Sequence, residues 1–225
     1  NLPSHASVVV IGGGIMGCST LYHLGKLGVS DAILLERNKL TSGTTWHSAA
    51  QVRALRNSQN LTRMIQYSVE LYSQLEHETG QSVGWIQKGS LSIATTMDRL
   101  IHIKRQEALA NAYGLNAISI SKGEASERWP MMNGDDVLGA VWSPDDGRVS
   151  PSDVCAALIK GARKTDNQIF ENCGVSAVLT KNGKVVGVET SAGTVMCDAI
   201  AVCSGLWSRD IGAMAGAEVP VLACE

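Results

Sequence analysis

Residues 6–36, ASVVVIGGGIMGCSTLYHLGKLGVSDAILLE, form the stretch that decides the fold. The β-branched run at 6–11 is typical of a buried strand. Apolar residues at helical spacing over 18–27 predict a helix, which Gly28 ends in the place where helix-terminal glycines belong. A second short apolar run at 32–35 predicts another strand. A strand, a helix and a strand within about 30 residues predict a parallel βαβ unit.

Three glycines between the first strand and the helix fit the pattern G-x-G-x-x-G. Gly12 allows a tight turn, Gly14 lets the backbone approach a diphosphate, and Gly17 lets the helix pack on the strand. Glu36 lies 19 residues after Gly17, at the end of the second strand. A carboxylate there accepts hydrogen bonds from ribose hydroxyls. The context of strand, helix and acidic residue predicts a dinucleotide site rather than a ligand-free turn.

The start of the helix supplies the groups for the phosphates. Backbone N–H groups near Ile15 and Met16 have no partner within the helix, and the helix dipole favours an anion there. The carboxylate of Glu36 disfavours the 2′-phosphate of NADP by charge repulsion. Arg37 either pairs with a phosphate or is solvated. NAD and FAD share this pattern, so both remain possible at this point.

The composition is that of an ordinary folded α/β protein. The chain has 225 residues, of which 44% are hydrophobic and 18% charged, with a net charge of −2. These values argue against disorder and against a general nucleic-acid binder. No apolar run reaches the roughly 18 residues that a membrane helix needs. Because the chain begins with Asn1 and stops at Glu225 within an apolar run, we expect a piece of a longer protein.

Six cysteines show no CxxC pair and no histidine at metal-ligand spacing. Several lie in apolar segments, which predicts buried, reduced thiols rather than disulfides or a zinc site. They are Cys18, Cys155, Cys173, Cys197, Cys203 and Cys224.

The rest of the chain reads as a mixed region that returns to the first unit. We expect helices at 62–79, 97–113, 121–129 and 151–164 and strands at 84–95 and 138–143. A meander of strands follows from 168, with separate strands at 194–197 and 199–203. The expected domains are residues 1–80, the first part of a dinucleotide-binding domain, 81–165, part of a substrate domain, and 166–225, the meander and return strand.

Several motifs in the same order give a family resemblance. The chain resembles the FAD-dependent amine oxidoreductases of the D-amino-acid oxidase type, and among them the sarcosine dehydrogenase and dimethylglycine dehydrogenase group. The motifs are VVVIGGGIMG (8–17), LLER (34–37), TSGTTWHSAA (41–50), ETG (78–80), GWIQKG (84–89), DG (146–147), GVET (187–190) and AVCSGLWS (201–208). The resemblance implies an α/β fold, with a Rossmann-like FAD-binding domain interleaved with a mixed-sheet substrate domain.

The loop at 41–50 is where the resemblance places the flavin. Its small hydroxyl residues leave room for a flat ligand and donate to phosphate; we expect Gly43, Thr44 and Thr45 to contact FAD. In the resembling group a Trp-His pair carries FAD covalently, and Trp46-His47 matches that pair. The alternative is that His47 is an ordinary loop histidine beside a non-covalent flavin.

The return segment at 201–208 is the second place where FAD is expected. The family commonly has Ala-Gly-x-Trp where this chain has Ser204, Gly205, Leu206 and Trp207. Gly205 tolerates close approach of a ligand to the backbone. Trp207 either contacts the cofactor or belongs to the core.

The resemblance implies flavin-dependent oxidative demethylation of a small N-methyl amino acid such as sarcosine or dimethylglycine. The electron acceptor would be oxygen or an electron-transfer protein. Any folate site would be formed by regions outside this chain. The expected location is the mitochondrial matrix in a eukaryote or the cytoplasm in a bacterium. We expect no membrane span and no nucleic-acid partner. The alternatives are a non-catalytic regulatory relative and an NAD-dependent dehydrogenase. No residue stands out as catalytic acid or base, and the possible cations for a substrate carboxylate are Arg53, Arg56, Arg63 and Lys88.

Overall fold

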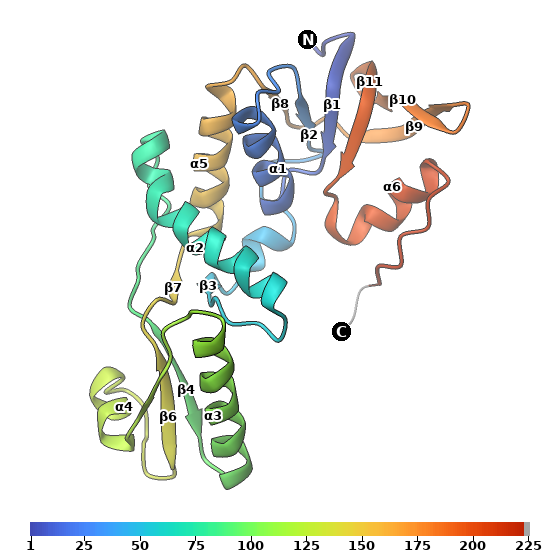
Figure 1. Ribbon diagram of the computed structural model, residues 1–225. Helices are drawn as coiled ribbons and strands as arrows, with labels where there is room; N and C mark the ends of the chain where they lie inside the picture. Colours follow the sequence, from blue (N-terminus) through green and yellow to red (C-terminus); the bar gives the residue numbers. More distant parts are fainter. Residues whose placement is uncertain (223–225) are drawn as a thin grey trace. The chain divides into compact units, whose positions relative to one another are not determined.

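The computed structural model describes residues 1–222 of the chain, which fold into two compact units (Figure 1). Unit 1 combines Asn1–Ala49, Leu75–Val83 and the segment from Ser150 onward, and unit 2 combines Ala50–Gln74 and Gly84–Val149. Both units are therefore built from separate stretches of chain, as the expected interleaving requires.

Unit 1 is built on a six-stranded sheet with the order β8-β2-β1-β11-β10-β9. Strands β8, β2, β1 and β11 run parallel, and β9, β10 and β11 form an antiparallel meander. This confirms the predicted βαβ unit and the return of the chain to it. The strands are β1 (His5–Ile11), β2 (Ile33–Leu35), β8 (Gln168–Phe170), β9 (Val175–Lys181), β10 (Lys184–Thr190) and β11 (Gly193–Val202).

The two strands expected at 194–197 and 199–203 are one continuous strand, β11. Asp198 separates the two apolar runs in the sequence, but its side chain is 75% exposed. Since alternate residues of a strand point to opposite faces, one polar residue on a solvated face does not interrupt the ladder.

Helices cover both faces of this sheet. Helices α1 (Ile15–Lys26) and α5 (Pro151–Arg163) lie side by side, and α6 (Ser208–Met214), which the sequence analysis missed, lies by β9 and β11 (Figure 1). Helix α1 ends at Lys26 with Leu27 as its C-cap, and the predicted terminating glycine, Gly28, follows with a φ of +92°. Val9 and Val10 of β1 are both fully buried, which shows that the central strand is covered on its two faces.

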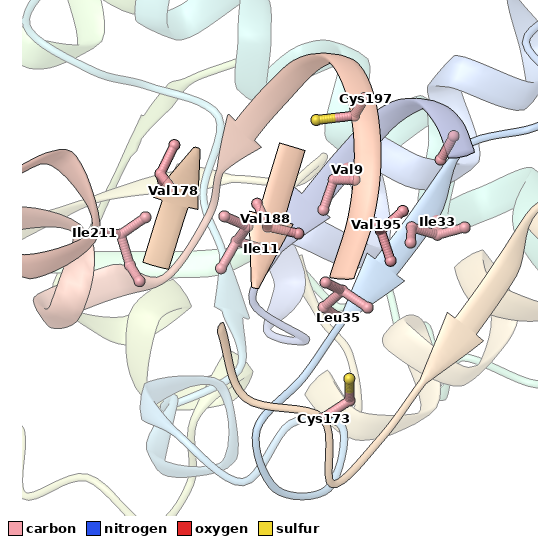
Figure 2. Packing of buried hydrophobic residues seen from close by; sticks show 11 residues of the cluster. Val9, Ile11, Ile33, Leu35, Cys173, Val178, Val188, Val195, Cys197 and Ile211 are labelled. Atoms are coloured by element: carbon pink, nitrogen blue, oxygen red, sulfur yellow. The ribbon is translucent and has the colours of Figure 1, made fainter. Parts of the chain in front are cut away.

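The core on the α6 side of the sheet consists mainly of small and β-branched residues (Figure 2). Alternate residues of β1, Val9 and Ile11, meet Val188 and Val195 of the meander, and Ile211 of α6 packs beside them. Strands β1 and β11 pair in parallel from His5 and Met196 to Ile11 and Val202.

Unit 2 contains two small antiparallel sheets, β4-β6-β5 and β3-β7. Helix α3 packs on the larger sheet through Ile103 and Ala110, which contact Ala94 and Val141. The elements are β3 (Gln51–Val52), α2 (Gln59–Thr79, whose last five residues belong to unit 1), β4 (Ser90–Ala94), α3 (Met97–Ala112), β5 (Ile118–Ile120), α4 (Lys122–Arg128), β6 (Gly139–Ser143) and β7 (Gly147–Arg148).

The strand expected at 84–95 is confirmed only over Ser90–Ala94. Gly84 and Gly89 have φ of +62° and +72°, outside the strand region, so the segment between them forms only a single bridge at Ile86. No helix within residues 1–222 is long and apolar enough to cross a membrane.

The observed division differs from the expected boundaries 1–80, 81–165 and 166–225. Residues 50–74 group with 84–149, in part because β3 pairs with β7. Helix α5, expected in the substrate domain, belongs to unit 1 because it packs on α1.

Candidate functional site

A cavity of about 850 Å³ opens in unit 1, beyond the carboxyl ends of β1, β2 and β11. Ligands of open α/β sheets bind at this edge. Five stretches contribute most of the lining, residues 11–16, 35–38, 41–45, 173–175 and 202–208. Most of the predicted cofactor-binding residues line it, namely Gly12, Gly14, Ile15, Met16, Glu36, Arg37, Gly43, Thr44, Thr45, Ser204, Gly205 and Trp207.

The glycine turn leaves no room for side chains. Gly12 has a φ of +113°, and a Cβ there would lie 2.5 Å from the carbonyl oxygen of Cys203. A Cβ on Gly17 would overlap the carbonyl oxygen of Gly12. Gly17, which the sequence analysis grouped with the cofactor-binding glycines, does not line the cavity, and its lack of a side chain lets the first turn of α1 pack against Gly12.

Gly13 is a position whose role the sequence analysis missed. Its N–H donates to Oε2 of Glu36 over 2.6 Å, and a Cβ on Gly13 would lie 2.9 Å from the Cβ of Glu36. The third glycine of the run is the signal that could have revealed this contact. This hydrogen bond holds the glycine turn close to the end of β2.

Glu36 is oriented by backbone donors on both carboxylate oxygens. Oε2 accepts from Gly13, and Oε1 accepts from the N–H of Asn38 over 2.8 Å. A carboxylate has about four lone-pair directions, so it can still accept from hydroxyl groups in the cavity. The turn and the following loop thus fix the predicted ribose partner in place.

The start of α1 faces the loop that contains the 3₁₀ helix η1 (Thr44–His47). Gly14, the N-cap, offers no side-chain hydrogen bond. Instead, Oγ1 of Thr45 accepts from the N–H of Ile15 over 2.9 Å. A hydroxyl from η1 therefore occupies one of the donors that a helix start presents to an anion.

Arg37 and Trp207 contact each other. The sequence analysis considered the two residues separately and did not predict this contact. The guanidinium carbon of Arg37 lies 4.0 Å from the centre of the Trp207 ring. Trp207 ends the 3₁₀ helix η2 (Gly205–Trp207) and is 42% exposed, so it is not a core residue. Both side chains line the cavity.

Trp46 and His47 do not line the cavity. Trp46 is 69% exposed, and His47 is also exposed. Nδ1 of His47 lies 3.1 Å from the carbonyl oxygen of Gly43 and donates the hydrogen of this bond, since a carbonyl can only accept. The Trp-His pair is therefore presented at the surface of the same loop that lines the cavity.

Two of the four cations considered for a substrate carboxylate have partners within unit 2. Nε of Arg53 lies 3.6 Å from Oδ2 of Asp146, and its guanidinium also donates to Ser92. The guanidinium of Arg56 donates to the backbone carbonyls of Arg53 and Leu55. Arg63 and Lys88 gain no assignment from the structure.

The cysteines are mostly buried, as predicted. Cys18, Cys155, Cys173 and Cys197 are buried and Cys203 is half-buried, while Cys224 lies outside the described residues. The neighbouring thiol of Cys155, together with burial, raises the pKa of Cys18 far above the usual range for a thiol. Cys18 is therefore a neutral packing residue behind the glycine turn.

The chain is similar to several proteins along nearly its whole length. It is 42% identical to mitochondrial sarcosine dehydrogenase of Mus musculus over 99% of the chain. It is 40% identical to both 4-methylaminobutanoate oxidase (formaldehyde-forming) of Paenarthrobacter nicotinovorans and the mitochondrial pyruvate dehydrogenase phosphatase regulatory subunit of Mus musculus, each over 100% of the chain. The chain spans about a quarter of the length of these relatives, 25%, 27% and 26% respectively.

Solved structures show the same fold. The crystal structure of L-proline dehydrogenase from P. horikoshii superposes with a TM-score of 0.91 at 29% identity, covering 96% of this chain and 57% of that one. The family model described as FAD dependent oxidoreductase matches residues 7–225. With its glycine turn, its oriented Glu36 and this match over nearly all residues, the chain belongs to the FAD-dependent oxidoreductase family.

Proposed function

We propose that the full-length protein containing this chain oxidatively demethylates a small N-methyl amino acid of the sarcosine or dimethylglycine type, with FAD as its cofactor. The observation that carries the proposal is the cavity at the glycine turn, in a chain of the FAD-dependent oxidoreductase family. Gly12 and Gly14 bring backbone to its wall, and a Cβ on Gly14 would lie 3.1 Å from Oγ1 of Thr45.

The residues along the cavity fit a dinucleotide. The N–H of Met16 at the start of α1 would bind the diphosphate, while that of Ile15 already donates to Oγ1 of Thr45. The carboxylate of Glu36 would accept from the ribose hydroxyls, and the hydroxyls of Thr44 and Thr45 would donate to phosphate oxygens. Because Glu36 already accepts from two backbone N–H groups, it needs no reorganisation to bind the ribose.

FAD, when bound, supplies the acceptor for a hydride from the methyl carbon next to the amine nitrogen. The amine must be neutral for its lone pair to assist, and the resulting C=N bond adds water and breaks to give formaldehyde and the demethylated amine. The methylene group can instead pass to tetrahydrofolate bound outside this chain. The final electron acceptor would be oxygen or an electron-transfer protein.

The names of the relatives support the substrate class. Sarcosine dehydrogenase and 4-methylaminobutanoate oxidase are both named for methylamino acids, and the second is named as forming formaldehyde. The mouse relative is mitochondrial, which supports a mitochondrial location if the source is a eukaryote.

We propose His47 as a covalent attachment point for FAD. Its Nε2 is free to form a bond when Nδ1 donates to Gly43. In that attachment Nε2 would replace one hydrogen of the 8α-methyl group of the flavin, and the hydrogen of Nδ1 would leave as a proton, which ends the contact with Gly43. Molecular oxygen would take up the two protons and two electrons as hydrogen peroxide.

A regulatory protein of the same fold is the second candidate. It is favoured by one finding, the 40% identity to a phosphatase regulatory subunit over the whole chain. An NAD-dependent dehydrogenase has no comparable support, because the matching family model is one of FAD-dependent enzymes.

Anaerobic titration of the purified full-length protein with sarcosine, dimethylglycine and 4-methylaminobutanoate tests the proposal. We expect one of them to bleach the visible flavin band, with glycine as the unmethylated control. Bleaching by dithionite but by none of the methylated amines would favour the regulatory candidate. Acid precipitation should leave the yellow colour in the pellet, and His47→Ala should release it to the supernatant.

A further inference from the structure

The contact between Arg37 and Trp207 spans the sheet edge at the glycine turn. In the order β2-β1-β11, the strand that leads into the glycines lies between the other two. Arg37 follows β2 by two residues, and Trp207 follows β11 by five. Because all three strands run parallel, these segments leave the sheet on either side of the turn, and the two side chains meet over 4.0 Å.

Two glycines lie within contact distance of the stacked side chains. A Cβ on Gly174 would lie 3.4 Å from the Cβ of Arg37, and a Cβ on Gly43 would lie 4.0 Å from the Trp207 ring. Both glycines also line the cavity. Both side chains are exposed, Trp207 to 42%, so the stack contributes to the cavity lining from the solvent-facing side.

The geometry leaves functional groups of both partners available to a ligand. A guanidinium that stacks by its face keeps its N–H donors in its own plane, where they can reach phosphate or ribose oxygens. No carboxylate forms an ion pair with Arg37 among the described residues. Its guanidinium therefore has no competing carboxylate among the described residues and can pair with an anionic group in the cavity.

We propose that Arg37 and Trp207 form a clamp across the adenosine diphosphate half of the cofactor, an inference that rests on the proposed function. The position next to Glu36 assigns the clamp to this half and not to the flavin. The planar stack holds the guanidinium over the ribose and diphosphate, strengthens binding and slows release. The two residues act as one unit, so replacing either side chain removes the contribution of the whole stack to cofactor affinity.

A double-mutant cycle on the full-length protein in a His47→Ala background, where FAD binds reversibly, tests the clamp. Trp207→Leu keeps an apolar side chain without the ring face, and Arg37→Lys keeps the charge without the planar group. We expect each to weaken binding of both FAD and ADP about fivefold, the size of a cation–π contact at a partly exposed site. The double variant should also lose about fivefold, not about 25-fold.

Lys39→Ala is the matched control. It removes a positive charge from the same loop, but Lys39 does not line the cavity, and its amino group lies 3.4 Å from Glu171. Its affinity for ADP should equal that of the parent. Unchanged affinity in the single variants, multiplied losses in the double variant, or a loss for FAD without a loss for ADP would each overturn the clamp. A parent that binds no FAD would instead contradict the proposed function.

Discussion

Unit 1 and unit 2 depend on different kinds of residue, glycines in unit 1 and a buried carboxylate in unit 2. The edge of unit 1 that lines the cavity requires glycine, because a Cβ on Gly12 or Gly17 would collide with a backbone carbonyl. Unit 2 depends on a buried carboxylate, Asp146, which is 5% exposed. Asp146 accepts from the N–H of Ala54 over 3.0 Å and from Oγ of Ser90 over 2.5 Å, and it pairs with Arg53.

The difference shows which substitutions each unit can tolerate. A backbone-lined edge is broken by adding a methyl group, because no flexible side chain can move out of the way. A network around a buried charge is disrupted when the charged side chain is removed, because the donors that it accepted from are then left buried and unpaired. The following predictions run from the largest expected effect to the smallest.

Gly17→Ala should have the largest effect. Its Cβ would overlap the carbonyl of Gly12, and the resulting shift of α1 should cost about 4 kcal/mol or more. Urea unfolding and flavin fluorescence should show lost stability and lost FAD binding together. Gly123→Ala is the control, because a Cβ there meets nothing closer than 3.9 Å. A Gly17→Ala protein with parental stability would contradict the packing described for the turn.

Asp146→Ala should destabilise unit 2 by about 3 kcal/mol, since it leaves the Ala54 N–H and the Arg53 guanidinium without their shared acceptor. Asp146→Asn keeps an acceptor oxygen and should cost less. Hydrogen exchange should speed up in residues 84–149 more than in residues 1–49. Equal acceleration in both ranges would break the distinction between the two units.

Tyr22→Phe should cost about 1 kcal/mol, because the Tyr22 hydroxyl donates to Glu78 over 2.5 Å and ties α1 to the end of α2. That hydrogen bond, with help from Lys26, holds the pKa of Glu78 below its ordinary value of 4.5. A carboxyl with a lowered pKa stabilises the folded state above about pH 4.5 and loses that contribution as the pH falls through the folded-state pKa. Tyr22→Phe should therefore flatten the loss of stability below pH 4.5 in urea titrations, and an unchanged acid profile would count against the link.

Thr45→Val should have the smallest effect, about 0.5–1 kcal/mol, the value of one cap hydrogen bond at the start of a helix. It removes the acceptor for the N–H of Ile15 but keeps the shape of the side chain. Thr45→Ser, which retains the hydroxyl, should have the melting temperature of the parent protein. If Val and Ser variants melt together, the hydroxyl does not cap α1.

The sequence predicted most of unit 1 because local signals there are strong. A buried β-branched strand, the glycine turn and Glu36 lie within 31 consecutive residues, and the structure places them at one cavity. The hydroxyl loop and the segment around Ser204 were located through family motifs.

What the sequence could not predict depends on contacts between distant residues. The Arg37–Trp207 stack joins positions 170 residues apart, and the grouping of α5 with unit 1 follows from packing on α1. The short strands β3, β5 and β7 are two or three residues long, too short to show a period. His47 matched its motif, yet the structure places it at the surface of its loop and outside the cavity lining.

The flavin content of the purified full-length protein tests the central claim most directly. We predict an absorption spectrum of bound flavin with one FAD per chain, and a Gly17→Ala variant without it. A parent protein that is folded and colourless, and that does not quench the fluorescence of added FAD, would contradict the assignment of the cavity at the glycine turn as a flavin site.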